Sequence, residues 1–477
     1  MKLSVQPRVF VFGVSGATWD VITPLANAGR LPNIRKLIDG GVSGVLASVR
    51  PEGDKHFRPQ TAWPCLSTGR RPESHGILRY FHTAAEMQVP SIWQLISDTG
   101  RNVGTYSWPM TWPPKEINGF DIPCYHARDR RTWPPELEDI RNLDRQSAKA
   151  VLDREGDARL RLLESLRMAQ VLARYNVLYP MAGSLLRSAA RVAFSASAEE
   201  RTLELRHAKQ QLACGLFLDL CRRYQPDASA FVTFLVDYIS HRYWRYHEPE
   251  KFGEAPAAPA IRNAVINAYI AVDNMLGRIL QRMDSNTVVA FVSEHGMAAE
   301  PDSTEHGDWH YVINAARLKQ FAGLDEHIHA HPIARWVAYR RDDGALIASA
   351  EVEKLQSLVV VETGEPLFQV FNQQHEIIVK FNLATDVAFY RQANLENLHI
   401  AMADKQIGFS ELARRNDRRR SAMHAEDAVF ILHGPGIKRG ASLQGAEIID
   451  IAPTLLCAAG IQTSAVFDGK VLDVFGS

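Results

Sequence analysis

The sequence predicts an α/β fold, a doubly wound and mostly parallel sheet flanked by helices, with a helical cap insertion. Short apolar runs rich in β-branched and aromatic residues alternate with segments of helical periodicity, as in βαβ units. These runs are apolar at nearly every position, which is typical of strands buried on both faces. The chain has 477 residues, of which 46% are hydrophobic. It is therefore long enough to bury a large core without disulfide bonds.

The expected elements follow in order from the N-terminus. Residues 8–14 (RVFVFGV) predict the first strand, because they are apolar and rich in β-branched and aromatic side chains. Helical spacing follows over 17–40. Residues 42–49 predict a second strand, and a further helix begins within 62–69. The remaining strands are expected at 102–107, 229–236, 287–293 and 428–432.

Changes in composition divide the chain into a core and two insertions. Residues 127–225 are rich in Arg, Leu, Ala and Glu and contain almost no β-branched runs, so we expect a helical cap there. Residues 325–420 contain short alternating runs, such as HEIIVKFNL, and predict a small α+β insertion. The α/β core then comprises the remaining segments, 1–126, 226–324 and 421–477.

Charge and cysteine content argue against several classes of protein. Lys plus Arg and Asp plus Glu each total 54, so the formal net charge is zero and does not favour a nucleic-acid-binding protein. The five cysteines include no CxxC pair, which indicates neither a zinc ribbon nor a disulfide framework and favours a cytoplasmic location. No run of about 18 uncharged apolar residues occurs, so we expect no stable membrane insertion.

Acidic and imidazole side chains stand next to the ends of several predicted strands. Ligands of open parallel sheets bind at the carboxyl ends of the strands, so these side chains are candidates for one site. The residues in question are Ser15, Asp237, His241, Glu294, His295 and His424. The segments that carry them are spread over hundreds of positions in the chain. This distribution indicates a metal site that the fold assembles from distant segments.

The segments that contain these residues carry a resemblance to a known family. They include FGVSGATWD at 12–20, AWPCLSTGRRPESHGI at 62–77 and VDYISHRYW at 236–244, and VSEHGM and MHAEDAVFILHGPGI follow further along. In this combination and order the chain resembles the alkaline phosphatase superfamily, in its type I phosphodiesterase/nucleotide pyrophosphatase branch. The resemblance covers the chain almost from end to end and implies an alkaline phosphatase-like fold.

The resemblance also implies a two-metal site, usually occupied by zinc or manganese. One ion would be bound by Asp237, His241 and His424. The other would be bound by the residue at position 15, by Glu294 and His295, and by a nucleophilic hydroxyl. Two divalent ions about 4 Å apart can activate a hydroxyl and stabilise both oxygens of an in-line phosphoryl displacement.

The chain departs from the family pattern at three positions, all in the second metal site or the nucleophile. The family's early Asp is Ser15, and a neutral hydroxyl is a poor replacement for a carboxylate ligand. The nucleophile position, nine residues before Thr68, is Pro59. Thr61 is the candidate catalytic residue only if its loop is displaced. The acid of the acid–His–Gly triplet is Glu294 in place of Asp, which puts the carboxylate one methylene further out.

Other residues are candidates for substrate binding, each with a plainer alternative. Ser15 is either a small turn residue, a hydrogen-bonding partner of phosphate or an alternative nucleophile. Lys55 and Arg58 could supply positive charge to a phosphoryl group, or they could belong to a solvated loop. Asp237 and His241, four residues apart, would without the other motifs be an ordinary pair on a helix, with Asp as N-cap.

We therefore expect a metal-dependent hydrolase that acts on a phosphorus ester of a small metabolite or nucleotide. The cofactor would be one or two divalent ions, zinc in the first place and manganese in the second. One alternative is metal-dependent transfer of a group to an organic acceptor on the same fold. Another is a non-catalytic relic that binds a ligand. No nucleic-acid partner is expected, and no oligomeric state follows from the sequence.

Overall fold

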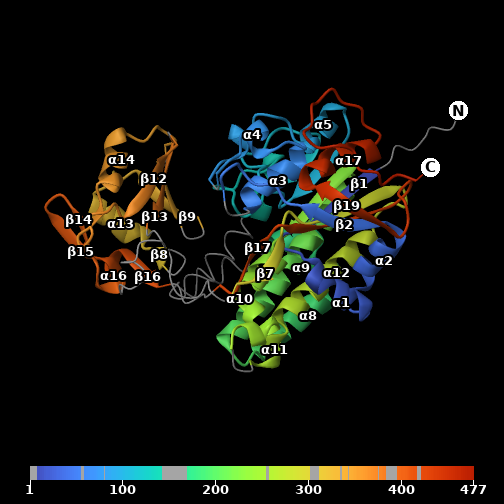
Figure 1. Cartoon of the computed structure of the whole chain (residues 1–477), viewed down its shortest axis with the longest axis horizontal. Coiled ribbons are helices and arrows are strands. Elements are labelled where there is room, and N and C mark those ends of the chain that lie inside the picture. Colours follow the sequence, from blue (N-terminus) through green and yellow to red (C-terminus); the bar gives the residue numbers. More distant parts are fainter. Residues whose placement is uncertain are drawn as a thin grey trace. The chain divides into compact units, whose positions relative to one another are not determined.

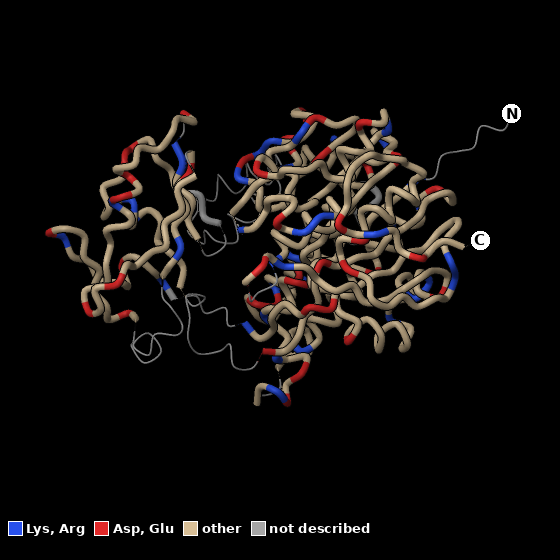
Figure 2. The backbone as a smooth tube through the Cα atoms, turned by 45° about the horizontal axis from the view of Figure 1, so that its top comes forward, with Lys and Arg blue, Asp and Glu red and all other residues tan. Residues whose placement is uncertain are grey.

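The computed structural model divides into two compact units (Figure 1), Met1–Ala299 with Ala422–Ser477, and Glu300–Ser421. It describes residues 8–54, 58–79, 81–141, 169–253, 257–300, 311–333, 336–341, 343–373, 375–382, 395–415 and 420–476. Basic and acidic residues are interspersed along the backbone of each unit (Figure 2), in keeping with the balanced charge of the sequence. No helix among the described residues is long and apolar enough to cross a membrane.

The larger unit is built on an eight-stranded sheet in the order β19-β2-β18-β6-β1-β5-β3-β4. The strands are β1 (Arg8–Val14), β2 (Val42–Ala47), β3 (Val103–Tyr106), β4 (Gly119–Ile122), β5 (Ala228–Thr233), β6 (Thr287–Val292), β18 (Asp427–His433) and β19 (Ala441–Glu447). The central strand β1 runs parallel to both of its neighbours, β5 and β6. Only β18 is antiparallel to the strands beside it. The predicted doubly wound, mostly parallel sheet is therefore confirmed.

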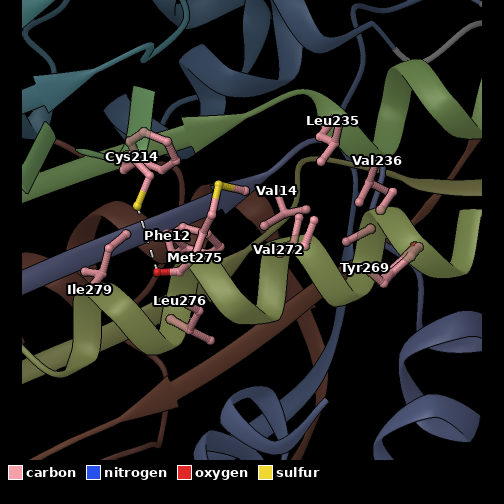
Figure 3. Packing of buried hydrophobic residues seen from close by; sticks show 14 of the residues in the cluster. Phe12, Val14, Cys214, Leu235, Val236, Tyr269, Val272, Met275, Leu276 and Ile279 are labelled. Carbon is pink, nitrogen blue, oxygen red and sulfur yellow. Dashed lines mark hydrogen bonds between the residues drawn. The ribbon is translucent and has the colours of Figure 1, made fainter. Parts of the chain in front are cut away.

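Helices cover both faces of this sheet because the side chains of β1 alternate between two cores. Phe10, Phe12 and Val14 belong to one hydrophobic cluster, and Val9 and Val11 belong to the other. The first cluster includes residues from α1 (Trp19–Asn27), α2 (Pro32–Gly40), α9 (Ala198–Tyr224), α10 (Leu235–His247) and α12 (Ala264–Leu280). The second includes residues from α3 (Pro59–Thr68), α5 (Ile92–Asp98) and α17 (Ile451–Ala458). Figure 3 shows α12 packed against Phe12 and Val14 in the first cluster.

The C-terminal half of α9 is part of the helical layer on the sheet. Its residues Cys214, Phe217 and Leu220 are buried in the first cluster. The helix α8 (Leu178–Ala193) precedes it and packs against it. Residues 142–168 of the expected cap lie outside the described residues. A separate helical cap over 127–225 therefore stays a prediction.

The smaller unit is a mixture of short strands and helices. Its principal sheet is antiparallel in the order β12-β13-β10-β9. The strands are β8 (Tyr311–Ile313), β9 (Ile328–Ile333), β10 (Trp336–Arg341), β11 (Val359–Val360), β12 (Phe368–Asn372), β13 (Glu376–Phe381), β14 (His399–Met402), β15 (Lys405–Gly408) and β16 (Ala413–Arg415). The helices are α13 (Ala315–Ala322), α14 (Ser349–Gln356) and α16 (Phe409–Leu412). The expected insertion at 325–420 falls within this unit, which begins earlier, at Glu300.

Several shorter elements complete the larger unit. They are the helices α4 (Pro72–His75) and α11 (Pro259–Arg262) and the strands β7 (Gly296–Ala299) and β17 (Ala422–Ala425). Strands β4 and β19 are absent from the sequence prediction. β4 has four residues, one of them Asp121, and β19 carries polar and exposed positions, so neither strand has the continuous apolar pattern of a buried strand.

Helix α2 is capped by a residue from another helix. Its own N-cap, Leu31, offers no side-chain hydrogen bond. Asp273 of α12, which is 1% exposed, accepts hydrogen bonds from Ile34 N at 2.8 Å and from Asn33 Nδ2 at 2.8 Å. The carboxylate thus satisfies amide groups that the start of a helix otherwise leaves without partners.

We expect Asp273→Ala to lower the free energy of unfolding by about 2–3 kcal/mol, because buried donors lose a charged acceptor. Asp39→Ala is the matched control on α2 itself, since the Asp39–Arg35 ion pair is exposed. The control should change stability by less than about 1 kcal/mol. Urea unfolding followed by fluorescence measures both. Equal effects of the two variants would contradict the capping role.

Candidate metal centre

Three side chains from two distant parts of the chain meet at the carboxyl end of the central strands. Helix α10 begins directly after β5 and carries Asp237 in its first turn and His241 one turn later. The spacing of four residues places both on one face of the helix. His424 comes from β17, which pairs antiparallel with β7. One ligand atom from each of these residues, called the triad below, lies within 4.8 Å of the others.

The separations within the triad fit a single tetrahedral ion. His241 Nε2 lies 3.3 Å from Asp237 Oδ1 and 2.9 Å from His424 Nε2. His424 Nε2 lies 3.4 Å from the same Asp237 oxygen. Two ligands of tetrahedral zinc, each at about 2.1 Å from the ion, are about 3.4 Å apart. The residues present therefore match a zinc-like ion in both geometry and donor type.

The hydrogen bonds and charges of the triad decide which of its atoms can bind a cation. His241 Nδ1 lies 2.6 Å from the carbonyl oxygen of Ala422 and donates to it, so Nδ1 carries a proton and Nε2 is the nitrogen that can bind a cation. Burial and the nearby His295 lower the pKa of His424 to about 4, so this ring is neutral at pH 7. Burial alone would raise the pKa of Asp237, but His241 and His424 outweigh it and hold that pKa well below its usual value.

The carboxylate of Asp237 is an anion with a buried oxygen. Its Oδ1 is buried and makes no hydrogen bond within the described part of the chain, although both imidazoles are within 3.4 Å. A buried anion without a donor is costly unless a cation compensates it. An anionic oxygen and two imidazole nitrogens form a donor set that suits zinc or manganese.

A second group of buried polar residues adjoins the triad. Ser15 Oγ donates a short hydrogen bond to Glu294 Oε1, and His295 Nε2 lies 3.2 Å from the same oxygen. The side chains of Glu294 and His295 are fully buried. Burial opposes protonation of His295, but Glu294 and Asp237 outweigh it and raise the pKa of His295. The ring of His295 stacks on that of His424, with centroids 3.9 Å apart.

Ser15 connects this group to the triad through the backbone. Its carbonyl oxygen accepts a hydrogen bond from Asp237 N at 3.1 Å. Gly16 follows in the left-handed region, with φ of +74°, and a Cβ there would lie 3.1 Å from Asp237 Cα. The turn after β1 therefore needs glycine to approach α10 so closely. Glu294 fills the space beside Ser15 with its longer side chain and has one oxygen, Oε2, without a hydrogen-bond partner among the described residues.

The structure places the remaining candidates differently. The hydroxyl of Thr61 donates to Arg58 O at 3.1 Å within α3, and the side chain is inaccessible to solvent. The guanidinium of Arg58 pairs with Asp54, with Nε 2.9 Å from Oδ2. Lys55 lies outside the described residues. The roles expected for Thr61, Arg58 and Lys55 therefore stay predictions, and the described contacts of Thr61 and Arg58 join neither of them to the triad.

Two polar residues absent from the sequence prediction form a hydrogen-bonded pair. Gln60 Nε2 is 2.9 Å from His126 Nε2. Burial lowers the pKa of His126 to about 4, and the charge of Asp237 opposes this effect. A lone histidine in the segment CYHARD offers no motif from which the pair could be predicted. For Gln60 the available signal was its position directly after Pro59, where the family's hydroxyl is missing.

Comparison with known proteins found one family that the chain matches. A family model described as type I phosphodiesterase / nucleotide pyrophosphatase matches residues 9–405, which is most of the chain. A search of curated proteins found no match.

We expect Asp237→Ala and His241→Ala to lose bound zinc, because each removes one of three ligands. His247→Ala is the matched control, since His247 is a second histidine on α10, in its last turn. Elemental analysis after gel filtration should find zinc in the wild type and the control and little in the two triad variants. Zinc retained by both triad variants would place the ion elsewhere.

Proposed function

The chain belongs to the type I phosphodiesterase/nucleotide pyrophosphatase family, and from this premise we propose that it hydrolyses a small phosphodiester or nucleotide-like ester with the help of a divalent cation. Zinc is the first expectation and manganese the second. The observation that carries the proposal is the convergence of Asp237, His241 and His424 at separations of 2.9–3.4 Å. A cytoplasmic location and the absence of a nucleic-acid partner stay predictions from composition.

Two adjoining groups of residues have separate proposed roles. Asp237, His241 and His424 would hold the cation, and the hydrogen bond from His241 to Ala422 O keeps the ring oriented toward it. A divalent cation at this position supplies Lewis-acid polarisation of a phosphoryl oxygen. Glu294 and His295 would hold a second, weaker cation or orient the substrate. Their engagement with each other and with Ser15 supports the weaker affinity.

The attacking oxygen is proposed to come from water rather than from the protein. Pro59 offers no hydroxyl at the position of the family's nucleophile. Thr61 is buried and its hydroxyl is bonded within its own helix, so the first turn of α3 would have to open before it could attack. Direct attack by water needs no covalent phospho-enzyme.

Transfer to an organic acceptor is the second candidate function. The same observation favours it, because a site without its own nucleophile leaves the attacking position to any hydroxyl that binds there. Product analysis separates the two reactions. In transfer the phosphoryl group appears on the acceptor, and in hydrolysis it appears as a free phosphomonoester. A ligand-binding relic would show neither product.

We expect the zinc-loaded protein to hydrolyse bis(p-nitrophenyl) phosphate and to lose about 100-fold or more of this rate after treatment with dipicolinate, because several kcal/mol of charge stabilisation are removed. Added zinc or manganese should restore the rate, and Asp237→Ala should remain inactive under all conditions. Equal rates before and after removal of the metal would exclude the proposed metal dependence.

The stereochemistry of the reaction tests the proposed attack by water. A chiral phosphorothioate diester hydrolysed in isotopically labelled water should show inversion at phosphorus, because a single displacement inverts the centre and the label makes the product chiral. Retention would show two displacements, and hence a covalent intermediate on a residue such as Thr61.

We expect Ser15→Asp to raise the metal content from about one ion per chain to about two, because the second group gains a carboxylate ligand. Ser15→Asn is the matched control, since it has the size of Asp without the charge, and it should stay at about one ion. Elemental analysis at saturating zinc measures all three proteins. Two ions in the wild type would mean that Glu294 and His295 bind the second ion without a carboxylate at position 15.

A further inference from the structure

The side chain of Gln60 is a buried amide, and one of its atoms has no hydrogen-bond partner among the described residues. Gln60 is the second residue of α3 and follows Pro59, and it is 4% exposed. Its Oε1 is buried and makes no hydrogen bond within the described residues. An acceptor buried without a donor is energetically unfavourable. Such a cost is expected where a ligand supplies the missing donor.

His126 determines which way this amide points. The Nε2 atoms of the two residues are 2.9 Å apart, and because an amide NH₂ can only donate, His126 Nε2 must accept. His126 is neutral at pH 7, because burial lowers its pKa to about 4. Its Nδ1 lies 3.5 Å from Cys124 Sγ, an arrangement that suits a proton on Nδ1 and a lone pair on Nε2. The Gln60 NH₂ then donates to His126, and Oε1 is the end left to accept.

Ring contacts connect the pair to the start of helix α10, which carries two residues of the triad. The ring centroid of His126 lies 4.0 Å from that of Tyr125 and 6.4 Å from that of Phe234. Phe234 is the N-cap of α10, three residues before Asp237. The charge of Asp237 also acts on His126. The amide of Gln60 is thus held at the start of α3, near the cation site, next to the position where the family has its hydroxyl.

We propose that Gln60 binds and orients the attacking water through Oε1, in place of the missing nucleophile, and that His126 is the residue that positions Gln60. The inference rests on the proposed function. A glutamine that orients water is an established device in phosphoryl transfer. An amide suits this task because it accepts a hydrogen bond without taking up a proton, so its contribution does not change with pH.

The step balances without any further reactant. One O–H of the water donates to Gln60 Oε1, and the water oxygen forms a bond to phosphorus. The P–O bond to the leaving group breaks, and the leaving oxygen keeps the bonding pair. The proton that the water loses passes to solvent, and the leaving oxygen takes up a proton in exchange. Gln60 and His126 neither gain nor lose a proton.

The test compares Gln60→Met with the wild type, because methionine keeps the length and volume of glutamine but offers no amide. With bis(p-nitrophenyl) phosphate and the zinc-loaded protein, kcat should fall about 10- to 100-fold, as when one positioned hydrogen bond is removed. KM should stay within about twofold, because the bond is made to the attacking oxygen rather than to the diester. Gln94→Met is the control, since Gln94 is a half-buried residue of α5 whose side chain bonds Asp98.

A binding measurement supplies a readout that does not depend on turnover. Orthovanadate imitates the five-coordinate phosphorus with an oxygen in the attacking position. Its affinity should fall about tenfold in Gln60→Met, while the affinity for inorganic phosphate should change less. His126→Ala should lower kcat as well. The double variant should be no slower than Gln60→Met alone, because His126 acts only through Gln60.

The outcomes separate this inference from the proposed function. Lower kcat and weaker vanadate binding, with zinc content and melting temperature unchanged, support the role of Gln60. A Gln60→Met protein that is as fast as the wild type, or that binds vanadate equally well, overturns it and leaves the proposed function intact. Additive losses in the double variant overturn the role of His126. A zinc-loaded wild type that turns over no phosphodiester removes the proposed function and this inference together.

Discussion

The site depends on one electrostatic constraint, which is that a carboxylate oxygen and two imidazole nitrogens face one another at 2.9–3.4 Å. Atoms with lone pairs repel at such distances unless a proton or a metal cation lies between them. The fold must therefore hold them together by other means. The start of α10, the β7–β17 pair and the hydrogen bond from His241 to Ala422 O provide this rigidity. The sheet acts as the frame that keeps the three groups in place.

The reversed direction of β18 explains how His424 reaches this frame. Asp237 and Glu294 follow parallel strands, so they lie at the carboxyl edge of the sheet. His424 precedes its strand, and only an antiparallel strand brings a preceding residue to that same edge. The polar residues around strands 229–236, 287–293 and 428–432 were sufficient to predict that they meet. The direction of the last strand had no signal in its apolar pattern, because a strand buried on both faces looks the same in either direction.

The sequence predicted the parts of the molecule that have a periodic or a family signal. The central strands, the first helices after them and the grouping of the triad residues at the sheet edge are in this class. Strand β4 was missed because four residues around a buried Asp121 show no pattern. Asp273 and His126 were missed for a different reason. Each acts through a contact with a residue far away in the chain, and a single sequence contains no record of such contacts. The substitutions at Ser15 and Pro59 were visible, but their consequences depend on Glu294 and Gln60 as neighbours in space.

The pairing of β7 with β17 has a consequence for how this chain acquired its smaller unit. Ala299 and Ala422 are direct register partners, and the chain leaves the larger unit at one and returns at the other. The whole of Glu300–Ser421 thus occupies the place of a hairpin turn. A short turn could replace it without altering any strand of the eight-stranded sheet. The smaller unit is in this sense a modular insertion between two paired strands. Its exchange for another segment would leave the strands that support the candidate site unchanged.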